Sequence, residues 1–443
     1  MTATQGRTHQ VSFAPNYDRQ NGWLEILDPL PEPTVLTGDL HVDHVVVGAG
    51  YGGLAAARRL AELDPGASIA LVEAGRVGNN AAGRCSGFII DHAHNIRAKS
   101  FDEDPDGAKE QIALNRMGID YLADIVRTNG IECDWRHEGK VHAAASSKGE
   151  RYLETFTKSL DAIDEDYSVL DAAECRRRFG TDFYIGGVLA PHSVVAQPAA
   201  LAAGLAATMP DNVLVFENSP VTDLDYGPPH TLRTARGTIV SPSLVLAANG
   251  FGEAFGFMKN RLIPMMTWGS MTRELTDDEV ERLGGLDHYA IIPAHPAGTS
   301  VRRLPERRIL IRNQYTFSRR SDFQKGREKI RAVHEKSFRN RYPMLPDVEF
   351  EYTWGGALSL SRNGAGVCGE LAPGVWSTMA YQGVGMAKGT TSGKLLAEHM
   401  MGETHPLMPL LSGSPSRNYP DPFNRWGIAL NARWRRWQAG IEE

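Results

Sequence analysis

The chain has 443 residues, of which 42% are hydrophobic and 23% are charged, and its formal net charge is −6. A globular chain of this length buries a large core and is expected to form two structural domains. It has no apolar run near the 18 or so residues that span a bilayer, and no signal-peptide pattern at its start. Its four cysteines form no CxxC pair, which suits a reducing compartment. The sequence therefore predicts a cytoplasmic protein with no membrane or nucleic-acid partner.

The first informative stretch is VVVGAGYGGLAAARRLAEL, at residues 45–63. Three consecutive valines are typical of a buried parallel strand. Gly48, Gly50 and Gly53 follow in G-x-G-x-x-G spacing, in which the first glycine permits a tight turn, the second lets a pyrophosphate approach and the third lets a helix pack on the strand. The apolar stripe after the turn predicts a helix lying on a sheet.

A second apolar run, SIALVEAG, closes on Glu73, 20 residues beyond Gly53, where a carboxylate would bind ribose hydroxyls. Strand, turn, helix, strand and acid together predict a dinucleotide site rather than an ordinary glycine turn. These residues alone do not choose between NAD and FAD, because both place a pyrophosphate on a helix N-terminus.

Three later segments extend the pattern. The stretch AGRVGNNAAGRCSGF after Glu73 is too rich in Gly, Asn and Ala for a regular element, and we expect a loop that contacts the cofactor. SPSLVLAANGFG predicts a strand at 244–247 that runs into a turn at Gly250. GVWSTMAYQGVGMAKGTTSGKLLAEHM predicts a strand, a bend at Gly383 and Gly385, and a helix through Leu395.

In this order the segments resemble the FAD-dependent amine and amino-acid oxidases of the D-amino-acid oxidase superfamily, and within it most closely the γ-glutamylputrescine oxidases. GGVLAPHSVVAQPAAL and WGGALSLSRNGAGVCGEL add to the resemblance, which covers residues 36 to 402. It implies an α/β fold: a discontinuous Rossmann-like FAD-binding domain with an inserted α+β substrate domain built on a mixed antiparallel sheet.

The resemblance also implies which residues hold FAD. Glu73 matches the position that binds the adenosine ribose, and Val221 matches the one whose backbone meets adenine. The turn before the last helix aims a positive helix end at the flavin pyrimidine, where it would stabilise reduced flavin. The implied cofactor-binding residues are Gly48, Gly50, Gly52, Gly53, Glu73, Ala74, Arg84, Cys85, Ser86, Val221, Gly250, Gly383, Val384, Gly385 and Met386.

Departures from the family pattern bear on the chemistry. Cys85 replaces an asparagine near the flavin ring, and we favour a small buried group over a redox thiol. Val384 stands where many relatives have a histidine. Leu358 lies near the position of an arginine that binds a substrate carboxylate in amino-acid-oxidising relatives. Ile311 lies near the position of a lysine that supports the reaction with oxygen in other relatives. Cys368 does not match the cysteine that attaches flavin in some relatives, so FAD is expected to be non-covalent.

Oxidation of a C–N bond requires a neutral amine in an apolar pocket. Alternation on the strand RRILIRNQYTF predicts that Arg312 and Tyr315 face opposite sides. Arg312 is a candidate to hold a distal substrate carboxylate, with a surface ion pair as the alternative. The candidate catalytic residues are Trp354, Tyr381, Tyr315 and Arg312, with Trp268 as a further aromatic candidate and core packing as the alternative for each aromatic.

Two further patterns received a functional and a structural interpretation. The segment from Arg302 to Arg341 holds 14 Lys and Arg against four acidic residues, which predicts a solvated basic face or guidance of an anionic substrate or acceptor. His92 and His94 have strand spacing, but we expect a hydrogen-bonded pair and no metal site.

The spacing of the FAD segments also predicts the domain organisation. The FAD-binding domain takes residues 36–100, 185–258 and 352–402, and the substrate domain takes residues 101–184 and 259–351. Residues 1–35 are expected to form an extension over the surface, and residues 403–443 an arm and a short helix.

These observations favour an FAD-dependent oxidase of a primary or secondary amine, and a γ-glutamylated amine is one candidate substrate. The reaction would yield an imine, then a carbonyl compound, and would reduce O2 to hydrogen peroxide. One alternative is a dehydrogenase that passes electrons to a carrier protein or quinone. Another is a flavin-binding protein whose catalytic machinery has decayed and which serves a structural or regulatory role. The oligomeric state stays open.

Overall fold

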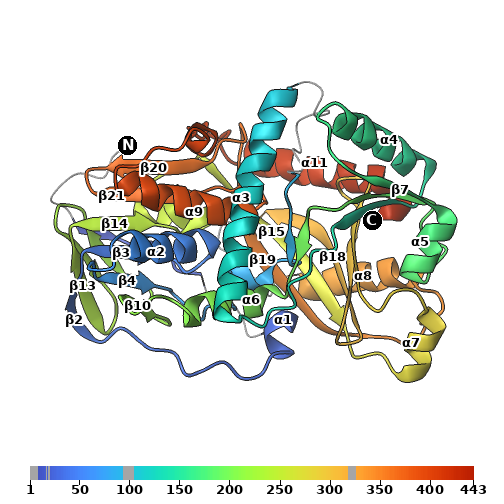
Figure 1. Cartoon of the computed structure of the whole chain (residues 1–443), viewed down its shortest axis with the longest axis horizontal. Coiled ribbons are helices and arrows are strands. Elements are labelled where there is room, and N and C mark those ends of the chain that lie inside the picture. Colours follow the sequence, from blue (N-terminus) through green and yellow to red (C-terminus); the bar gives the residue numbers. More distant parts are fainter. Residues whose placement is uncertain (1–7, 16, 18–19, 93–103, 318–325) are drawn as a thin grey trace.

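The computed structural model describes residues 8–15, 17, 20–92, 104–317 and 326–443 and shows two domains side by side (Figure 1). One is built on a mainly parallel sheet and the other on a large mixed sheet. This confirms the predicted fold class.

The first domain centres on a six-stranded sheet of order β10-β4-β3-β14-β21-β20. Its first five strands are parallel, and β20 is antiparallel to β21. Both faces are buried, which explains the unbroken apolar runs in the sequence. The strands are β3 (His44–Val47), β4 (Ile69–Val72), β10 (Val213–Phe216), β14 (Ser243–Leu246), β20 (Val367–Ala372) and β21 (Val375–Met379).

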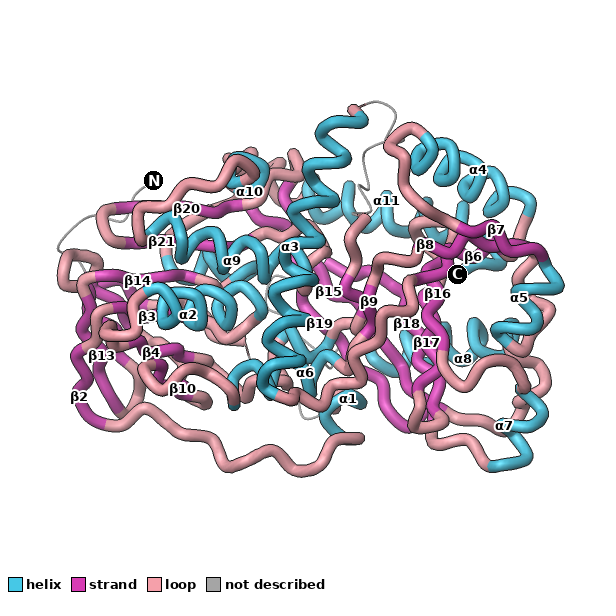
Figure 2. Tube along the Cα trace, in the orientation of Figure 1, coloured by secondary structure: helices cyan, strands magenta, loops and turns pink. Residues whose placement is uncertain are grey.

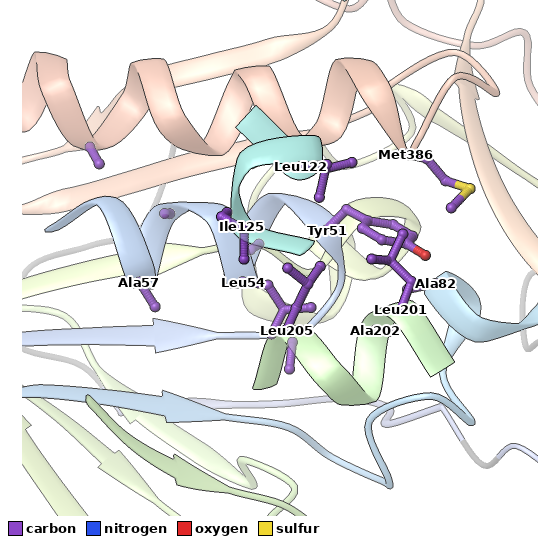
Figure 3. Close-up of a cluster of buried hydrophobic side chains, with 14 of the residues drawn as sticks. Tyr51, Leu54, Ala57, Ala82, Leu122, Ile125, Leu201, Ala202, Leu205 and Met386 are labelled. Carbon is purple, nitrogen blue, oxygen red and sulfur yellow. The ribbon is translucent and has the colours of Figure 1, made fainter. Parts of the chain in front are cut away.

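Helices cover one face of this sheet. Figure 3 shows Leu54 of the helix after the glycine turn among side chains of two neighbouring helices, including Leu122 and Leu205. Val46 of β3 belongs to this same cluster. The helices are α2 (Tyr51–Leu63), α3 (Pro105–Asn129), α6 (Pro198–Ala207) and α9 (Ala387–Met400).

A five-stranded sheet of order β1-β11-β12-β13-β2 covers the other face. Val45 and Val47 pack against its side chains, so successive valines of β3 serve opposite cores. The strands are β1 (Thr8–Gln10), β2 (Gly38–His41), β11 (Asp223–Asp225), β12 (His230–Arg233) and β13 (Gly237–Ser241).

The second domain carries an eight-stranded sheet of order β19-β15-β18-β17-β16-β6-β8-β7, in which only β16 and β6 pair in parallel (Figure 2). The strands are β6 (Lys140–Ala144), β7 (Ser168–Asp171), β8 (Gly186–Ala190), β15 (Leu262–Thr272), β16 (Tyr289–Pro293), β17 (Ser300–Leu304), β18 (Arg308–Phe317) and β19 (Phe350–Ser361). The helices of this domain are α4 (Ser147–Asp161), α5 (Ala172–Phe179), α7 (Asp277–Leu283) and α8 (Arg327–Arg341).

Shorter elements complete the fold. Within the described ranges, no helix is both long and apolar enough to span a bilayer. The remaining elements are α1 (Gly22–Glu25), η1 (Ala81–Arg84), β5 (Phe88–Ile89), β9 (Val194–Val195), η3 (Asn249–Phe255), α10 (Met408–Leu411), α11 (Phe423–Ala439) and η4 (Gly440–Glu442).

The observed division of the chain differs from the expected one. Strand β8 lies in the sheet of the substrate domain, although residues 185–258 were assigned to the FAD-binding domain. Strand β19 pairs with β15 over its whole length, so that sheet continues to Ser361. Conversely, α3 packs on α9 in the first domain. Strand and helix patterns show that an element buries a face, but they do not show against which sheet.

The described N-terminal residues do more than extend over the surface. Strand β1 pairs with β11, and the side chain of Trp23 is buried against Trp354, with ring centroids 6.4 Å apart. Residues 24–35 are partly or fully exposed, as an extension would be, but the residues before them supply an edge strand and core side chains.

The basic segment is only partly a solvated face: Arg339 is exposed, whereas three other arginines are internal. Arg302, Arg303 and Arg341 are buried and donate hydrogen bonds to main-chain carbonyl oxygens. Arg302 reaches from β17 to the carbonyl oxygen of Ala196, 2.7 Å away, and its guanidinium lies over the Trp23 ring. Burial lowers the pKa of Arg302 to about 10. These arginines are internal connectors rather than a solvated face.

A buried charge network joins the two domains near Asp91. Its carboxylate accepts hydrogen bonds from the His92 ring at 3.0 Å and from the Arg116 guanidinium at 3.0 Å, and Arg116 also pairs with Glu165 at 2.5 Å. Lys140 lies nearby on β6, and burial lowers its pKa to about 8. Asp91, His92 and Glu165 lie close enough to hold a metal ion, but Arg116 already bridges both carboxylates. His94, the other half of the predicted pair, lies outside the described residues.

The network predicts acid sensitivity. Burial alone would raise the pKa of Glu165, but hydrogen bonds from His92 and Arg116 outweigh burial and lower it from 4.5 to about 2. The stabilisation is therefore complete above pH 4.5 and is lost as the pH falls toward 2. Glu165→Gln should lower the free energy of unfolding by about 1 kcal/mol or more at neutral pH, with the difference from the wild type closing across that interval.

Urea unfolding as a function of pH measures this difference. The exposed neighbour Asp164, whose side chain pairs with Lys109 at the surface, provides the matched control Asp164→Asn, which should change little. A Glu165→Gln difference that stays constant down to pH 2 would contradict the prediction.

Candidate active site

The glycine turn lies at the carboxyl end of β3, and α2 begins directly after it. Gly48 has a φ of +103°, and a Cβ there would lie 2.8 Å from the carbonyl oxygen of Ala247. A Cβ on Gly53 would collide with the carbonyl oxygen of Gly48, which is the close helix-to-strand contact that the motif predicts. A Cβ on Gly50 would meet nothing within 4 Å, because this residue faces an open cavity.

Glu73 fixes the position of this turn. One carboxylate oxygen accepts hydrogen bonds from the amide of Ala49 at 2.9 Å and from the side chain of Asn80 at 3.1 Å. The other accepts from the amide of Gly75 at 3.1 Å. Glu73 is nearly buried but lines the cavity beside the N-terminus of α2, whose first amides have no side-chain cap. A helix end of this kind attracts phosphate.

The loop after Glu73 contains a short 3-10 turn, η1, where no regular element was expected. Arg84 ends this turn, and its guanidinium donates to the carbonyl oxygens of Asn79 at 2.9 Å and Gly355 at 3.0 Å. The same guanidinium lies over the Tyr17 ring, 5.0 Å from its centroid. The loop is therefore held between the N-terminal segment and β19, with Arg84 and its neighbours along the cavity wall.

Cys85 lies on this wall as a half-buried thiol. Its sulfur is 3.5 Å from the sulfur of Met386 and 3.5 Å from the carbonyl oxygen of Ala82. Burial raises the pKa of Cys85, which keeps the group protonated. These surroundings match a small apolar group. Cys368 is buried elsewhere, in β20, and does not line the cavity.

A second turn, from Gly383 to Met386, precedes α9 and faces the same cavity. Gly383 has a φ of +88°, and the helix begins at Ala387 without a side-chain cap. Val384 lines the cavity at the position where a histidine was noted in relatives. Two helix N-termini, those of α2 and α9, therefore open onto one space.

Arg312 and Tyr315 meet at the other end of the cavity. Alternation placed them on opposite faces of the strand, and this expectation was wrong. Gln314 has a φ of +59°, and the pairing with β15 shifts register between Thr267 and Trp268. The bulge turns Tyr315 to the side of Arg312, whose guanidinium donates to the tyrosine hydroxyl at 2.8 Å. Both side chains line the cavity.

The other aromatic candidates differ in position. Trp354 and Trp268 are each 1% exposed and lie outside the cavity lining. Trp354 instead donates from its ring nitrogen to the carbonyl oxygen of Arg84 at 3.1 Å, so it supports the cavity wall from behind. Tyr381 lines the cavity with its ring, while its hydroxyl points into the core and bonds to Thr378.

All these parts surround one cavity of about 790 Å³ that runs from the first domain to the second. That volume is in the range of cofactor and substrate sites. The sequence-predicted residues along its wall are Gly48, Gly50, Gly52, Glu73, Ala74, Arg84, Cys85, Ser86, Val221, Gly250, Arg312, Tyr315, Tyr381, Gly383, Val384, Gly385 and Met386.

Two wall segments were missed. The N-terminal stretch contributes Phe13 and Tyr17, and α11 contributes residues at a four-residue spacing, such as Ile428, Ala432 and Arg436. The aromatic residues of VSFAPNY, at 11–17, could have indicated that this stretch contacts the cavity. In the helix, a row of small and polar residues along one side and tryptophans along the other could have indicated which side faces the cavity.

Comparisons with known proteins agree with this geometry. The sequence model of the family described as DAO, FAD dependent oxidoreductase, matches residues 43–399. The chain is 24% identical over 400 residues to a probable oxidoreductase, OrdL, of Haemophilus influenzae, covering 84% of this chain and 86% of that protein. It is also 24% identical over 373 residues to gamma-glutamylputrescine oxidoreductase of Escherichia coli, covering 83% of this chain and 85% of that protein.

Among solved structures, glycine oxidase from Geobacillus kaustophilus has a similar fold. The TM-score is 0.71 at 18% sequence identity, and the match covers 86% of this chain and all of that one. At this identity the likeness is one of fold.

Gly50 provides a test of the cofactor cradle. A Cβ at Gly50 meets no protein atom within 4 Å and lies on the cavity side, so the Gly50→Val protein should fold and lose FAD affinity by at least about tenfold. The flavin absorbance that remains bound after gel filtration measures this loss, and thermal unfolding of the flavin-free protein measures folding.

Gly227, where an added Cβ also meets nothing within 4 Å, lies outside the cavity lining and supplies the control Gly227→Val. Equal flavin retention in the Gly50 and Gly227 variants would contradict the assignment of the turn.

Proposed function

Because the chain belongs to the DAO family of FAD-dependent oxidoreductases, we propose that it oxidises the C–N bond of a primary or secondary amine that carries a distal carboxylate, rather than an α-carboxylate, with O2 as the electron acceptor. A γ-glutamylated amine is one example of this class. The products are an imine, which hydrolyses to a carbonyl compound, and hydrogen peroxide.

FAD fits the described cavity. Gly50 leaves space for a pyrophosphate beside the first amides of α2, and Glu73 and Val221 line the same end. Cys85 and the turn before α9 line its middle. FAD held by these residues would supply the acceptor for a hydride from the carbon next to the substrate nitrogen.

The protein's contribution is to hold an uncharged amine in an apolar space. Met265, Ile292 and Pro293 line the substrate end of the cavity, and apolar surroundings favour the neutral form of an amine. The neighbouring guanidiniums act in the same direction, because positive charges lower the pKa of a bound ammonium group.

The proposal that the substrate carries a carboxylate rests on the excess of positive charge at the substrate end of the cavity. Arg312, Arg435 and Arg436 line it, whereas among the described lining residues the only carboxylate is Glu73 at the opposite end. Arg312 bonds to Tyr315 and has no acidic partner in the described part of the chain. A guanidinium held in place by a tyrosine hydroxyl is suited to bind a carboxylate.

One observation favours a second candidate, a dehydrogenase that reduces a carrier protein or quinone. No lysine lines the cavity among the described residues, and Ile311, which stands near the position of the oxygen-serving lysine in some relatives, is fully buried in the core of the second domain.

Anaerobic reduction of the flavin-loaded protein, followed by air, separates these candidates. Bleaching of the flavin spectrum by a carboxylate-bearing amine and rapid recovery with formation of peroxide supports the oxidase. Bleaching with slow recovery supports the dehydrogenase. Bleaching by α-amino acids alone overturns the amine assignment, and no bleaching by any of these compounds favours a protein without catalytic activity.

The role of Arg312 is testable with paired substrates. Arg312→Met should lower kcat/KM for a carboxylate-bearing amine by about 10- to 100-fold, mainly through KM, because a charge-assisted hydrogen bond is lost. The same variant should leave kcat/KM for an amine with an uncharged tail nearly unchanged.

Steady-state kinetics with both substrates measure the effect. Arg339, an exposed residue of the same basic segment, provides the control Arg339→Met. An equal loss with both substrates would contradict carboxylate binding by Arg312.

A further inference from the structure

Helix α11 is red in Figure 1, and several of its large apolar side chains are exposed. Trp426, Leu430, Trp434 and Trp437 are 60%, 67%, 55% and 77% exposed. Their spacing places them along one side of the helix, which we call the tryptophan stripe. A surface helix ordinarily buries such a stripe against the protein. Here the side that contacts the protein carries smaller and more polar residues instead.

The charge of this helix is as unusual as its exposure. Between Phe423 and Ala439 it contains four arginines and no Asp or Glu, whereas the whole chain has a net charge of −6. Two of the arginines, Arg435 and Arg436, line the cavity, and Arg433 is exposed next to the stripe. The surface that the helix presents is therefore apolar and positively charged.

These two features select among possible occupants. A second copy of the same helix would bring two positive surfaces together, which costs free energy. An anionic lipid surface is complementary in charge, and tryptophan and arginine are the side chains that amphipathic helices use at a membrane interface. We propose that the tryptophan stripe of α11 attaches this protein peripherally to an anionic membrane surface.

The expectation of no membrane partner rested on the absence of a spanning segment. Peripheral attachment needs none, because the helix lies in the plane of the interface with only its stripe inserted. The opposite side of α11 lines the catalytic cavity, through residues such as Ile428 and Ala432. Attachment therefore places one wall of the cavity directly above the lipid surface.

Vesicle sedimentation of the flavin-loaded full chain tests the proposal. The protein should sediment with vesicles of phosphatidylcholine mixed with phosphatidylglycerol, and weakly or not at all with vesicles of phosphatidylcholine alone. Trp434→Ser/Trp437→Ser should reduce partitioning about tenfold or more, because less apolar area inserts. Arg433→Gln should reduce it roughly fivefold at low salt.

Exposed apolar residues elsewhere supply the control. Val169→Ser/Leu286→Ser alters residues that are 69% and 43% exposed in the substrate domain, and it should leave partitioning unchanged. Retained flavin and unchanged thermal unfolding would show that each variant is folded.

Two results would overturn the proposal. The first is no sedimentation of the wild type with anionic vesicles. The second is a dimer, detected by light scattering, that Trp434→Ser/Trp437→Ser converts to a monomer, because the stripe would then be an interface between two copies.

Discussion

The carboxylate of Glu73 is the interaction on which the site depends. It accepts hydrogen bonds from the amide of Ala49 in the glycine turn, from the amide of Gly75 and from the side chain of Asn80 in the loop that follows. Strand β3, strand β4 and the loop after Glu73 are thus joined at one point, at the carboxyl edge of the parallel sheet. Open α/β sheets bind ligands at this edge, since the strand ends and helix N-termini meet there.

The second domain is held to the first by buried polar contacts rather than by apolar packing alone. Arg302 crosses from the large sheet to the loop before α6, and the network around Asp91 links α3 to the substrate domain. Buried charges are costly unless each is paired, so these contacts specify one relative position of the domains. The cavity between the domains takes its shape from that position.

Local patterns predicted the glycine turn and the acid of the nucleotide half of the site. Gly48, Gly50 and Glu73 act through backbone geometry over a few residues, which the sequence displays directly. The cofactor residues beyond this motif were implied by the family resemblance, and of the whole set all but Gly53 line the cavity. The substrate half depends on long-range facts. The bulge at Gln314 contains no glycine, so the sequence gives no sign of it. Trp354 is a core residue because Trp23, which is distant in the sequence, packs against it.

Segments from distant parts of the chain complete the cavity wall: Phe13, Pro15 and Tyr17 near its start, and α11 after the last strand of either sheet. During synthesis the two sheets and both helix N-termini can form before α11 has left the ribosome. The cofactor site is then assembled but still open on one side. The wall of this site is complete only when α11 docks.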